Sequence, residues 1–229
     1  MPRAFFPAMF CGTAANAIEL RQFQRLATHV YFRSGQTIFS ERELAETVFG
    51  LSQGVVRLYK RLPDGRRQVL SFALPGDFLG MPFAERHNFS ADAVGEVALC
   101  GFSRGELAKF IQSSRNIMRL MIEFAIRELD MAQDQLLLLG NGSAEEKVAM
   151  FLVSWRNRLS RITPFSETVP LPMRRQDIAD FLGLKLETVS RTLAKLEHRN
   201  VLRLVPKGVF LTGLEHTLLV TGRTHQPQI

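Results

Sequence analysis

The chain has 229 residues, of which 46% are hydrophobic and 22% charged, with a formal net charge of +7. This composition is ordinary for a globular protein of one large domain or two modest ones. No apolar run reaches membrane-spanning length, and two cysteines are too few for a disulfide-stapled secreted fold, so we expect no membrane partner.

The two ends of the chain differ in character. The first 17 residues loosely resemble a secretory signal, but the positive charge of Arg3 is single and Pro7 interrupts the apolar stretch. We therefore expect no export and place the protein in the cytoplasm. Residues 171–229 hold 9 basic and 5 acidic side chains, a basic excess of the kind that attracts the phosphates of DNA.

From about Val30 to Gly101 the sequence has the texture of β-structure. Short apolar segments, many of them alternating, are bounded by glycine, proline and aspartate. Asp64 and Gly65 mark a hairpin tip, because glycine tolerates positive φ there. The pattern predicts a compact antiparallel roll or barrel. The expected strands are residues 30–32, 37–40, 47–50, 54–61, 68–73 and 97–102.

Near Ser113 the period changes to alternating four- and three-residue steps, which continue to the break at residues 140–142. This predicts one long helix that pairs with its twin from a second subunit, while a second apolar row covers the roll. A buried helix inside a monomer is the alternative. The predicted pairing residues, called the seam below, are Met118, Ile122, Ala125, Leu129, Ala132, Leu136 and Leu139. The second row is Ile117, Met121, Phe124 and Met131.

A capping box at residues 143–146 predicts another helix, running to about Leu159 with Val148, Phe151, Leu152 and Trp155 inward. Residues 176–197 then have the spacing of a helix-turn-helix, with Gly183 in the turn, where φ > 0 is expected. Their expected apolar contacts are Ile178, Ala179, Leu182, Leu184, Val189, Leu193 and Leu196.

The second helix of this motif also has a polar face. Glu187, Ser190 and Arg191 project outward together at its start, where a helix in the major groove reads bases. Arginine can donate twice to guanine, and glutamate can accept from cytosine. The alternative is an ordinary amphipathic hairpin with solvated charges.

Further basic and polar residues surround this face. Residues 201–204 and 209–211 flank a turn with a basic tip, so the motif is expected to be a winged helix. We expect DNA phosphates to be contacted by Arg174, Arg175, Thr188 and Lys207.

The order of these parts resembles the Crp/Fnr superfamily of bacterial transcription regulators, from about residue 25 onward. The most specific motifs are PGDFLG (75–80), AEEKVAMFL (144–152) and residues 171–197. The resemblance implies an α+β fold: an N-terminal antiparallel β-roll of the cyclic-nucleotide-binding type (1–112), a dimerisation helix and hinge (113–141), and a C-terminal winged helix-turn-helix that binds DNA (142–229).

The second helix of the motif, called the reader helix below, is similar to that of the Fnr-like branch. In that branch a glutamate is followed three and four residues later by serine and arginine. This implies a homodimer on an inverted repeat of TTGAT-type half-sites, with Arg191 on guanine, Glu187 on the opposing cytosine and Ser190 near a thymine. Leu186 replaces an arginine of the cyclic-AMP-responsive branch. Residues 63–66 and 161–167 are implied contacts to RNA polymerase.

Two departures from the family pattern bear on sensing. Cyclic-nucleotide binders hold the ribose and the phosphate with a glutamate and an arginine, at places occupied here by Met81 and Phe89, with Ser90 retained. Iron–sulfur members use four cysteines, and this chain has two. We therefore expect no cofactor, and Cys100 as a core residue. The remaining resemblance is to FixK-like regulators, which activate genes for low-oxygen respiration or nitrogen metabolism.

Other functions stay open at this point. A haem sensor would use His87, expected on an exposed loop, as axial ligand, and Cys11 would be the residue for a redox role. In a different class, a ligand-binding module would use the winged helix to dock a protein. An enzyme is not expected, because the sequence has no glycine-rich phosphate loop, nucleophile elbow or metal-spaced His/Cys cluster.

Overall fold

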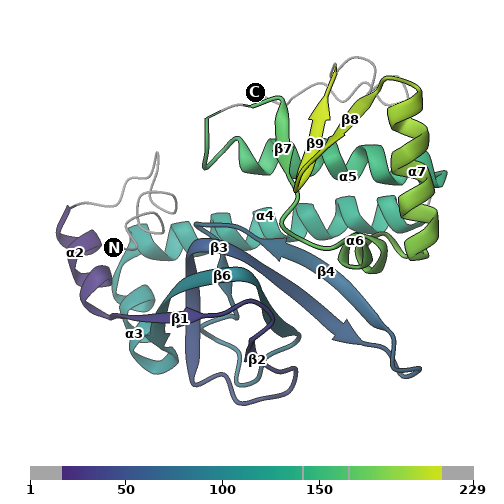
Figure 1. The fold of residues 1–229 in the computed structure, drawn as a ribbon. Helices are drawn as coiled ribbons and strands as arrows, with labels where there is room; N and C mark the ends of the chain where they lie inside the picture. The colour runs from purple at the N-terminus through teal and green to yellow at the C-terminus, as the bar shows by residue number, and fades with distance from the viewer. Residues whose placement is uncertain (1–16, 141, 165, 213–229) are drawn as a thin grey trace. The chain divides into compact units, whose positions relative to one another are not determined.

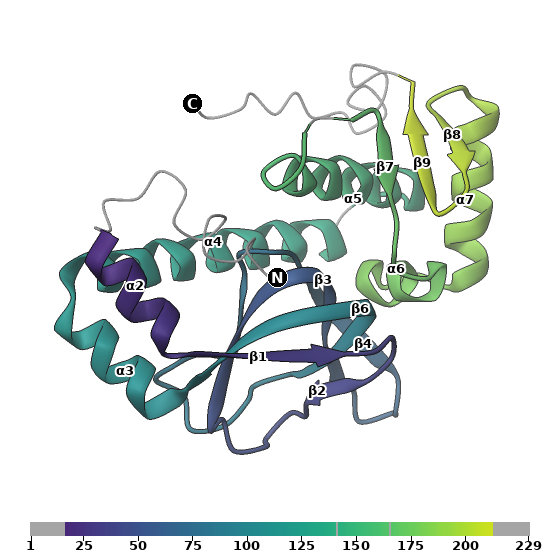
Figure 2. The same ribbon diagram turned by 60° about the vertical axis from the view of Figure 1, so that its left-hand side comes forward.

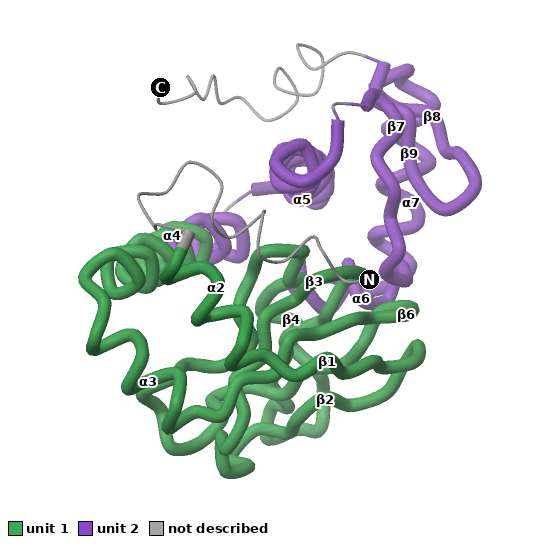
Figure 3. Tube along the Cα trace, turned by 90° about the vertical axis from the view of Figure 1, so that its left-hand side faces the viewer, with its two compact units in different colours: residues 1–132 green, residues 133–229 purple. Residues whose placement is uncertain are grey.

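The computed structural model describes residues 17–140, 142–164 and 166–212, and the chain divides into two compact units, residues 1–132 and 133–229 (Figure 3). Within the described residues, no helix combines the length and the apolar character needed to cross a lipid bilayer.

The first unit is built on one antiparallel sheet (Figure 1). Its strands lie in the order β1-β6-β3-β4, while β2 pairs with β6 and β5 with β3. The strands are β1 (Ala27–Phe32), β2 (Thr37–Phe39), β3 (Thr47–Arg61), β4 (Arg67–Ala73), β5 (Phe78–Leu79) and β6 (Ser90–Ser103). The helices are α2 (Ala17–Arg25), α3 (Arg104–Ser113) and α4 (Arg115–Gly140), which extends into the second unit.

The antiparallel roll predicted from the sequence is confirmed, with corrections to its strands. The two segments expected at 47–50 and 54–61 form one strand, β3, whose pairing with β6 shifts register around Gly54. Gly54 has φ +92°, and a Cβ there would lie 2.4 Å from the carbonyl oxygen of Glu96, so a side chain is excluded. Strand β6 begins at Ser90, seven residues before the expected start.

Helices α2 and α3 were not expected, and α4 begins at Arg115, after a break at the buried Ser114. Figure 2 shows both short helices with the first part of α4 at the end of the sheet where β1 begins. The Ser114 hydroxyl donates to Glu19 of α2 at 2.6 Å, and Asn116 Nδ2 donates to the same carboxylate at 3.0 Å. These bonds fasten α2 to the start of α4.

The predicted second row of α4 forms part of the core of the first unit. Ile117, Met121 and Phe124 are buried there, whereas Met131 is half-buried. The Phe124 ring meets Phe78 edge to face, with centroids 5.6 Å apart. One side of the first part of α4 is therefore packed into the core of the first unit.

The described residues of the second unit form the end of α4 and helices α5, α6 and α7, packed with a small antiparallel sheet. Helix α5 begins at the predicted capping box, in which Glu146 N donates to Ser143 Oγ at 3.3 Å and Ser143 N to Glu146 Oε2. Strand β7 was not expected; it adds a third strand in the order β7-β9-β8. The elements are α5 (Ala144–Leu159), β7 (Thr168–Pro170), α6 (Arg175–Leu182), α7 (Leu186–His198), β8 (Leu202–Val205) and β9 (Gly208–Leu211).

Candidate nucleic-acid interface

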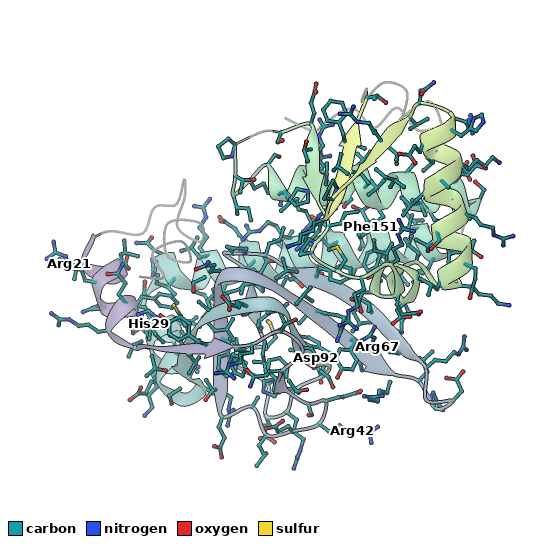
Figure 4. All side chains as sticks on the ribbon, viewed as in Figure 1. Arg21, His29, Arg42, Arg67, Asp92 and Phe151 are labelled. Atoms are coloured by element: carbon teal, nitrogen blue, oxygen red, sulfur yellow. The ribbon has the colours of Figure 1, made fainter. Side chains whose placement is uncertain are left out.

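Helices α6 and α7 form the predicted helix-turn-helix. Gly183 ends α6 in the left-handed conformation, with φ +63° and ψ 32°, and Leu184 N donates to Ala179 O at 3.0 Å. The ring of Phe181 lies 5.5 Å from that of Phe151 in α5; Figure 4 labels Phe151. The predicted apolar contacts are all buried except Leu184, which is half-buried; the buried ones are Ile178, Ala179, Leu182, Val189, Leu193 and Leu196.

The opposite face of α7 is open to solvent. Glu187 and Arg191 are exposed and Ser190 is half-buried. Within the described part of the chain, neither the Glu187 carboxylate nor the Arg191 guanidinium has a hydrogen bond or ion pair. The Glu187 carboxylate can therefore accept hydrogen bonds from an external partner, and the Arg191 guanidinium can donate them to one.

The candidate phosphate contacts lie on three neighbouring parts of the same unit. Arg174 and Arg175 are exposed where α6 begins, and Thr188 is half-buried in the first turn of α7. Lys207 is exposed in the turn between β8 and β9, with φ +60°, and its carbonyl accepts from Leu171 N at 2.8 Å. This bond holds the wing tip beside the segment that leads into α6.

Polar contacts that the sequence did not reveal fix the position of α7. Glu145 of α5 accepts hydrogen bonds from Lys195 and from Arg199 Nη1, the latter at 2.7 Å. The hydrogen bond from Lys195 lowers the pKa of the Glu145 carboxyl. These partners are 50 or more positions apart, so sequence spacing contains no signal for them.

The seam residues of α4 divide into two groups. Ile122, Leu129 and Leu136 are 53%, 58% and 69% exposed, and Ala125 and Ala132 are exposed beside them. The residues at the two ends of the seam, Met118 and Leu139, are each half-buried instead. Met118 packs on the core of the first unit, and a Cβ at Gly183 would lie 3.4 Å from Leu139 Cδ2.

The expected exposure of His87 is wrong. Its side chain is 5% exposed and stacks on Phe39, with ring centroids 3.7 Å apart, and burial lowers its pKa. Nδ1 has no hydrogen-bond partner among the described residues and faces the Gly80 backbone, where a Cβ would lie 3.3 Å away. A ring enclosed in this way leaves no room for a porphyrin, so the residues do not fit the haem alternative.

The one cysteine among the described residues is Cys100. Cys100 is a fully buried core residue, as predicted, with Sγ 3.7 Å from His29 Nδ1, and burial raises the pKa of its thiol to about 11. Cys11 lies outside the described residues. Among the residues that the structure describes, no group of three or more His, Cys, Asp or Glu side chains could hold a metal ion.

The places where relatives hold a cyclic nucleotide have apolar side chains here. Met81 is 43% exposed, and the half-buried Phe89 packs on Phe39 at 5.9 Å. Nearby, Asp92 pairs with Arg57 Nη2 at 2.7 Å and accepts from Thr37 Oγ1 at 2.9 Å; Figure 4 labels Asp92 inside the roll. Phe89 cannot balance a phosphate charge, so these residues do not fit a cyclic nucleotide held in that manner.

Comparison with known proteins identifies both units. Residues 29–114 match the model of the cyclic nucleotide-binding domain, and residues 146–215 match that of the Crp-like helix-turn-helix domain. The chain is 54% identical to the transcriptional activatory protein AadR of Rhodopseudomonas palustris, over 87% of this chain and 83% of AadR. It is 51% identical to the nitrogen fixation regulation protein FixK of Bradyrhizobium diazoefficiens, over 87% and 84%.

A solved structure supports the same assignment. FixK2 from Bradyrhizobium japonicum superimposes with a TM-score of 0.79 at 35% identity, covering 85% of this chain and 96% of FixK2. Helix α7 lies within the residues that match the Crp-like helix-turn-helix domain. The chain belongs to the Crp/Fnr family of transcriptional activators and is similar to its FixK members.

Proposed function

We propose that the protein is a homodimeric activator that binds an inverted repeat of TTGAT-type half-sites and controls genes of low-oxygen or nitrogen metabolism. The observation that supports this most directly is the polar face of α7, on which Glu187 and Arg191 are exposed while the opposite face is buried. We propose no enzymatic activity.

Each side chain of this face has a base that suits its chemistry. Arg191 would donate to O6 and N7 of guanine, Glu187 would accept from N4 of the opposing cytosine, and Ser190 would lie near a thymine. Around the face, Arg174, Arg175, Thr188 and Lys207 would hold phosphates and fix the helix in its register.

The second subunit would pair along the seam of α4. Exposed leucine and isoleucine at 122, 129 and 136, with alanines between them, are what a second helix needs for close packing. A two-fold pair would place two reader helices in successive major grooves of a palindrome. In this arrangement residues 1–112 form a sensor-like domain, 113–141 the dimerisation helix and hinge, and 142–229 the DNA-binding domain.

Activation would take place in the cytoplasm by recruitment of RNA polymerase. The surface candidates are the turn at residues 63–66 and the segment 161–167. In the turn, Asp64 accepts from Arg66 Nε at 2.7 Å, and both side chains stay largely exposed.

Selection of bound fragments from random DNA tests the proposal. We expect recovery of a TTGAT-type inverted repeat. Arg191→Ala should then lower affinity for this site about ten- to hundredfold and blur the choice at one base, with little effect on random DNA. An equal loss on both DNAs would contradict the assignment of Arg191 as a base reader.

A further inference from the structure

An apolar groove of about 180 Å³ lies beside α4 in the first unit. One wall is the loop after β5, with Met81 and Phe83, and the other is α4, with Met121, Ile122 and Ala125. Met81 and Phe83 are 43% and 52% exposed. A phenylalanine that is half exposed at the rim of an apolar groove still has apolar surface in water, so the groove suits an apolar occupant.

Ile126 is an exposed apolar side chain of α4, within the first unit, that the seam does not use. It is 53% exposed, as much as Ile122, yet it lies one position beyond the seam residue Ala125. In heptad terms Ile122 and Leu129 are a positions and Ala125 is a d position, so Ile126 is an e position and Met121 a g position. In a parallel pair, each e side chain lies beside the g side chain of the other helix, five residues earlier in number.

Only one heptad of α4 has apolar side chains at both the g position and the e position that pair in this way. Coiled coils usually place charged residues at e and g, but Met121 and Ile126 are both apolar. One heptad later the corresponding pair is Glu128 and Gln133, which is polar. The apolar pair therefore coincides with the stretch of α4 that lines the groove.

We propose that Ile126 of the partner subunit enters this groove, between Phe83 and Met121, so that the loop after β5 becomes part of the dimer interface. The inference rests on the proposed parallel homodimer. The groove is continuous with the seam, because Ile122 and Ala125 belong to both.

The area that a dimer needs supports the same occupant. A stable interface takes about 800 Å² from each partner, and a narrow stripe with alanine at two of its positions supplies only part of this. Met81, Phe83 and Ile126 supply further apolar area on both sides of the two-fold axis. The same contact would link the roll mechanically to the helix pair.

Disulfide trapping in the full-length chain tests the proposal. Phe83→Cys and Ile126→Cys are introduced singly into chains of different tag length that also contain Cys11→Ser, and the two chains are mixed and oxidised. We expect a cross-link between subunits only when both variants are present. Tyr31→Cys, an exposed aromatic position on β1 at 69% exposure, replaces Phe83→Cys as the matched control and should not cross-link to Ile126→Cys.

Leu129→Cys separates the two possible failures. This seam position should cross-link to itself across the two-fold axis. A Leu129 cross-link without the 83–126 cross-link would overturn the groove contact and leave the homodimer standing. Absence of both cross-links, in chains whose circular dichroism matches the parent, would overturn the homodimer itself.

A thermodynamic measurement checks the same contact without oxidation. Phe83→Ala and Ile126→Ala should each weaken dimerisation about tenfold, and the double variant should lose less than the product of the two. Losses that simply multiply would mean that the two side chains do not meet across the interface.

Discussion

The carboxylate of Glu197 in α7 accepts a 2.7 Å hydrogen bond from the backbone N–H of Leu204 in β8. Glu197 is half-buried at the end of the reader helix, and Leu204 lies in the first strand of the wing. This side chain therefore ties the last turns of α7 to the first strand of the wing, beside the backbone hydrogen bond from Val201 N to Leu196 O.

Removal of this carboxylate should loosen the wing. Glu197→Ala leaves the Leu204 N–H without its acceptor, and we expect a loss of about 1–3 kcal/mol in the free energy of unfolding of this unit. Glu197→Gln retains an acceptor oxygen and should lose less. Chemical denaturation measures both variants, and a free energy of unfolding equal to that of the parent in Glu197→Ala would show that the hydrogen bond contributes nothing measurable.

The wing tip should report on phosphate contact through salt. Lys207→Ala is expected to weaken binding to all DNA sequences alike and to reduce the slope of log K against log salt by about one. The control is Arg21→Ala, an exposed arginine of α2 (Figure 4), which should leave the slope unchanged. A wing that docks a protein instead of DNA would leave the slope unchanged in both variants.

Stability of the first unit should fall in mild acid because of His87. Burial lowers the pKa of this side chain, while the charge of Glu43 opposes the shift. A folded-state pKa below the unfolded value means that the unfolded chain binds the proton more tightly. The contribution of the neutral, buried His87 side chain to the free energy of unfolding is thus fully present above its unfolded-state pKa of about 6.5. It is lost as the pH falls below that value.

Thermal unfolding between pH 5 and pH 8 measures this dependence. His87→Phe keeps an aromatic ring against Phe39 but cannot titrate, so its melting temperature should fall less steeply with acid than that of the parent. Curves of equal steepness would assign the acid sensitivity to other groups.

The Cys100 thiol should be inert in the folded protein. With its pKa raised to about 11, the thiol holds about a hundredfold less reactive thiolate at pH 8 than an ordinary cysteine. In a Cys11→Ser chain, iodoacetamide should label Cys100 only after denaturation. Rapid labelling of the native chain would show that β6 opens readily.

Cyclic AMP should have no effect on this protein. Phe89 packs on Phe39 where relatives need a cation, so the phosphate would be left without its counter-charge. We expect no change in melting temperature with millimolar cyclic AMP, although a ligand that binds the folded state raises it. A saturable rise would mean that other side chains replace the missing arginine.

Local periodicity was sufficient to predict the helices and the β8–β9 hairpin of the second unit, although not strand β7. The burial of Val189, Leu193 and Leu196 and the left-handed turn at Gly183 follow from spacing alone, because each depends on its near neighbours. The exposed stripe of α4 could be predicted in the same way.

Features fixed by distant contacts could not be predicted. Among the described side chains of helix α2, Phe23 alone is fully buried, which is too little to give a helical period. Glu19 of the same helix meets Ser114 across 95 positions. His87 stands in a polar run that suggests exposure, yet Phe39, from another strand, covers it. The Arg57–Asp92 pair likewise joins two strands that only the fold brings together.

The exposed apolar seam of α4 affects how the activity of such a regulator depends on the amount of protein that is made. If two chains must dimerise before they can bind a palindrome, the concentration of active dimer rises with the square of the monomer concentration while most chains are monomeric. A modest change in expression then becomes a larger change in promoter occupancy. Newly made chains that have not dimerised would expose Ile122 and Leu129 to chaperones and proteases. Their removal would make promoter occupancy depend still more steeply on expression.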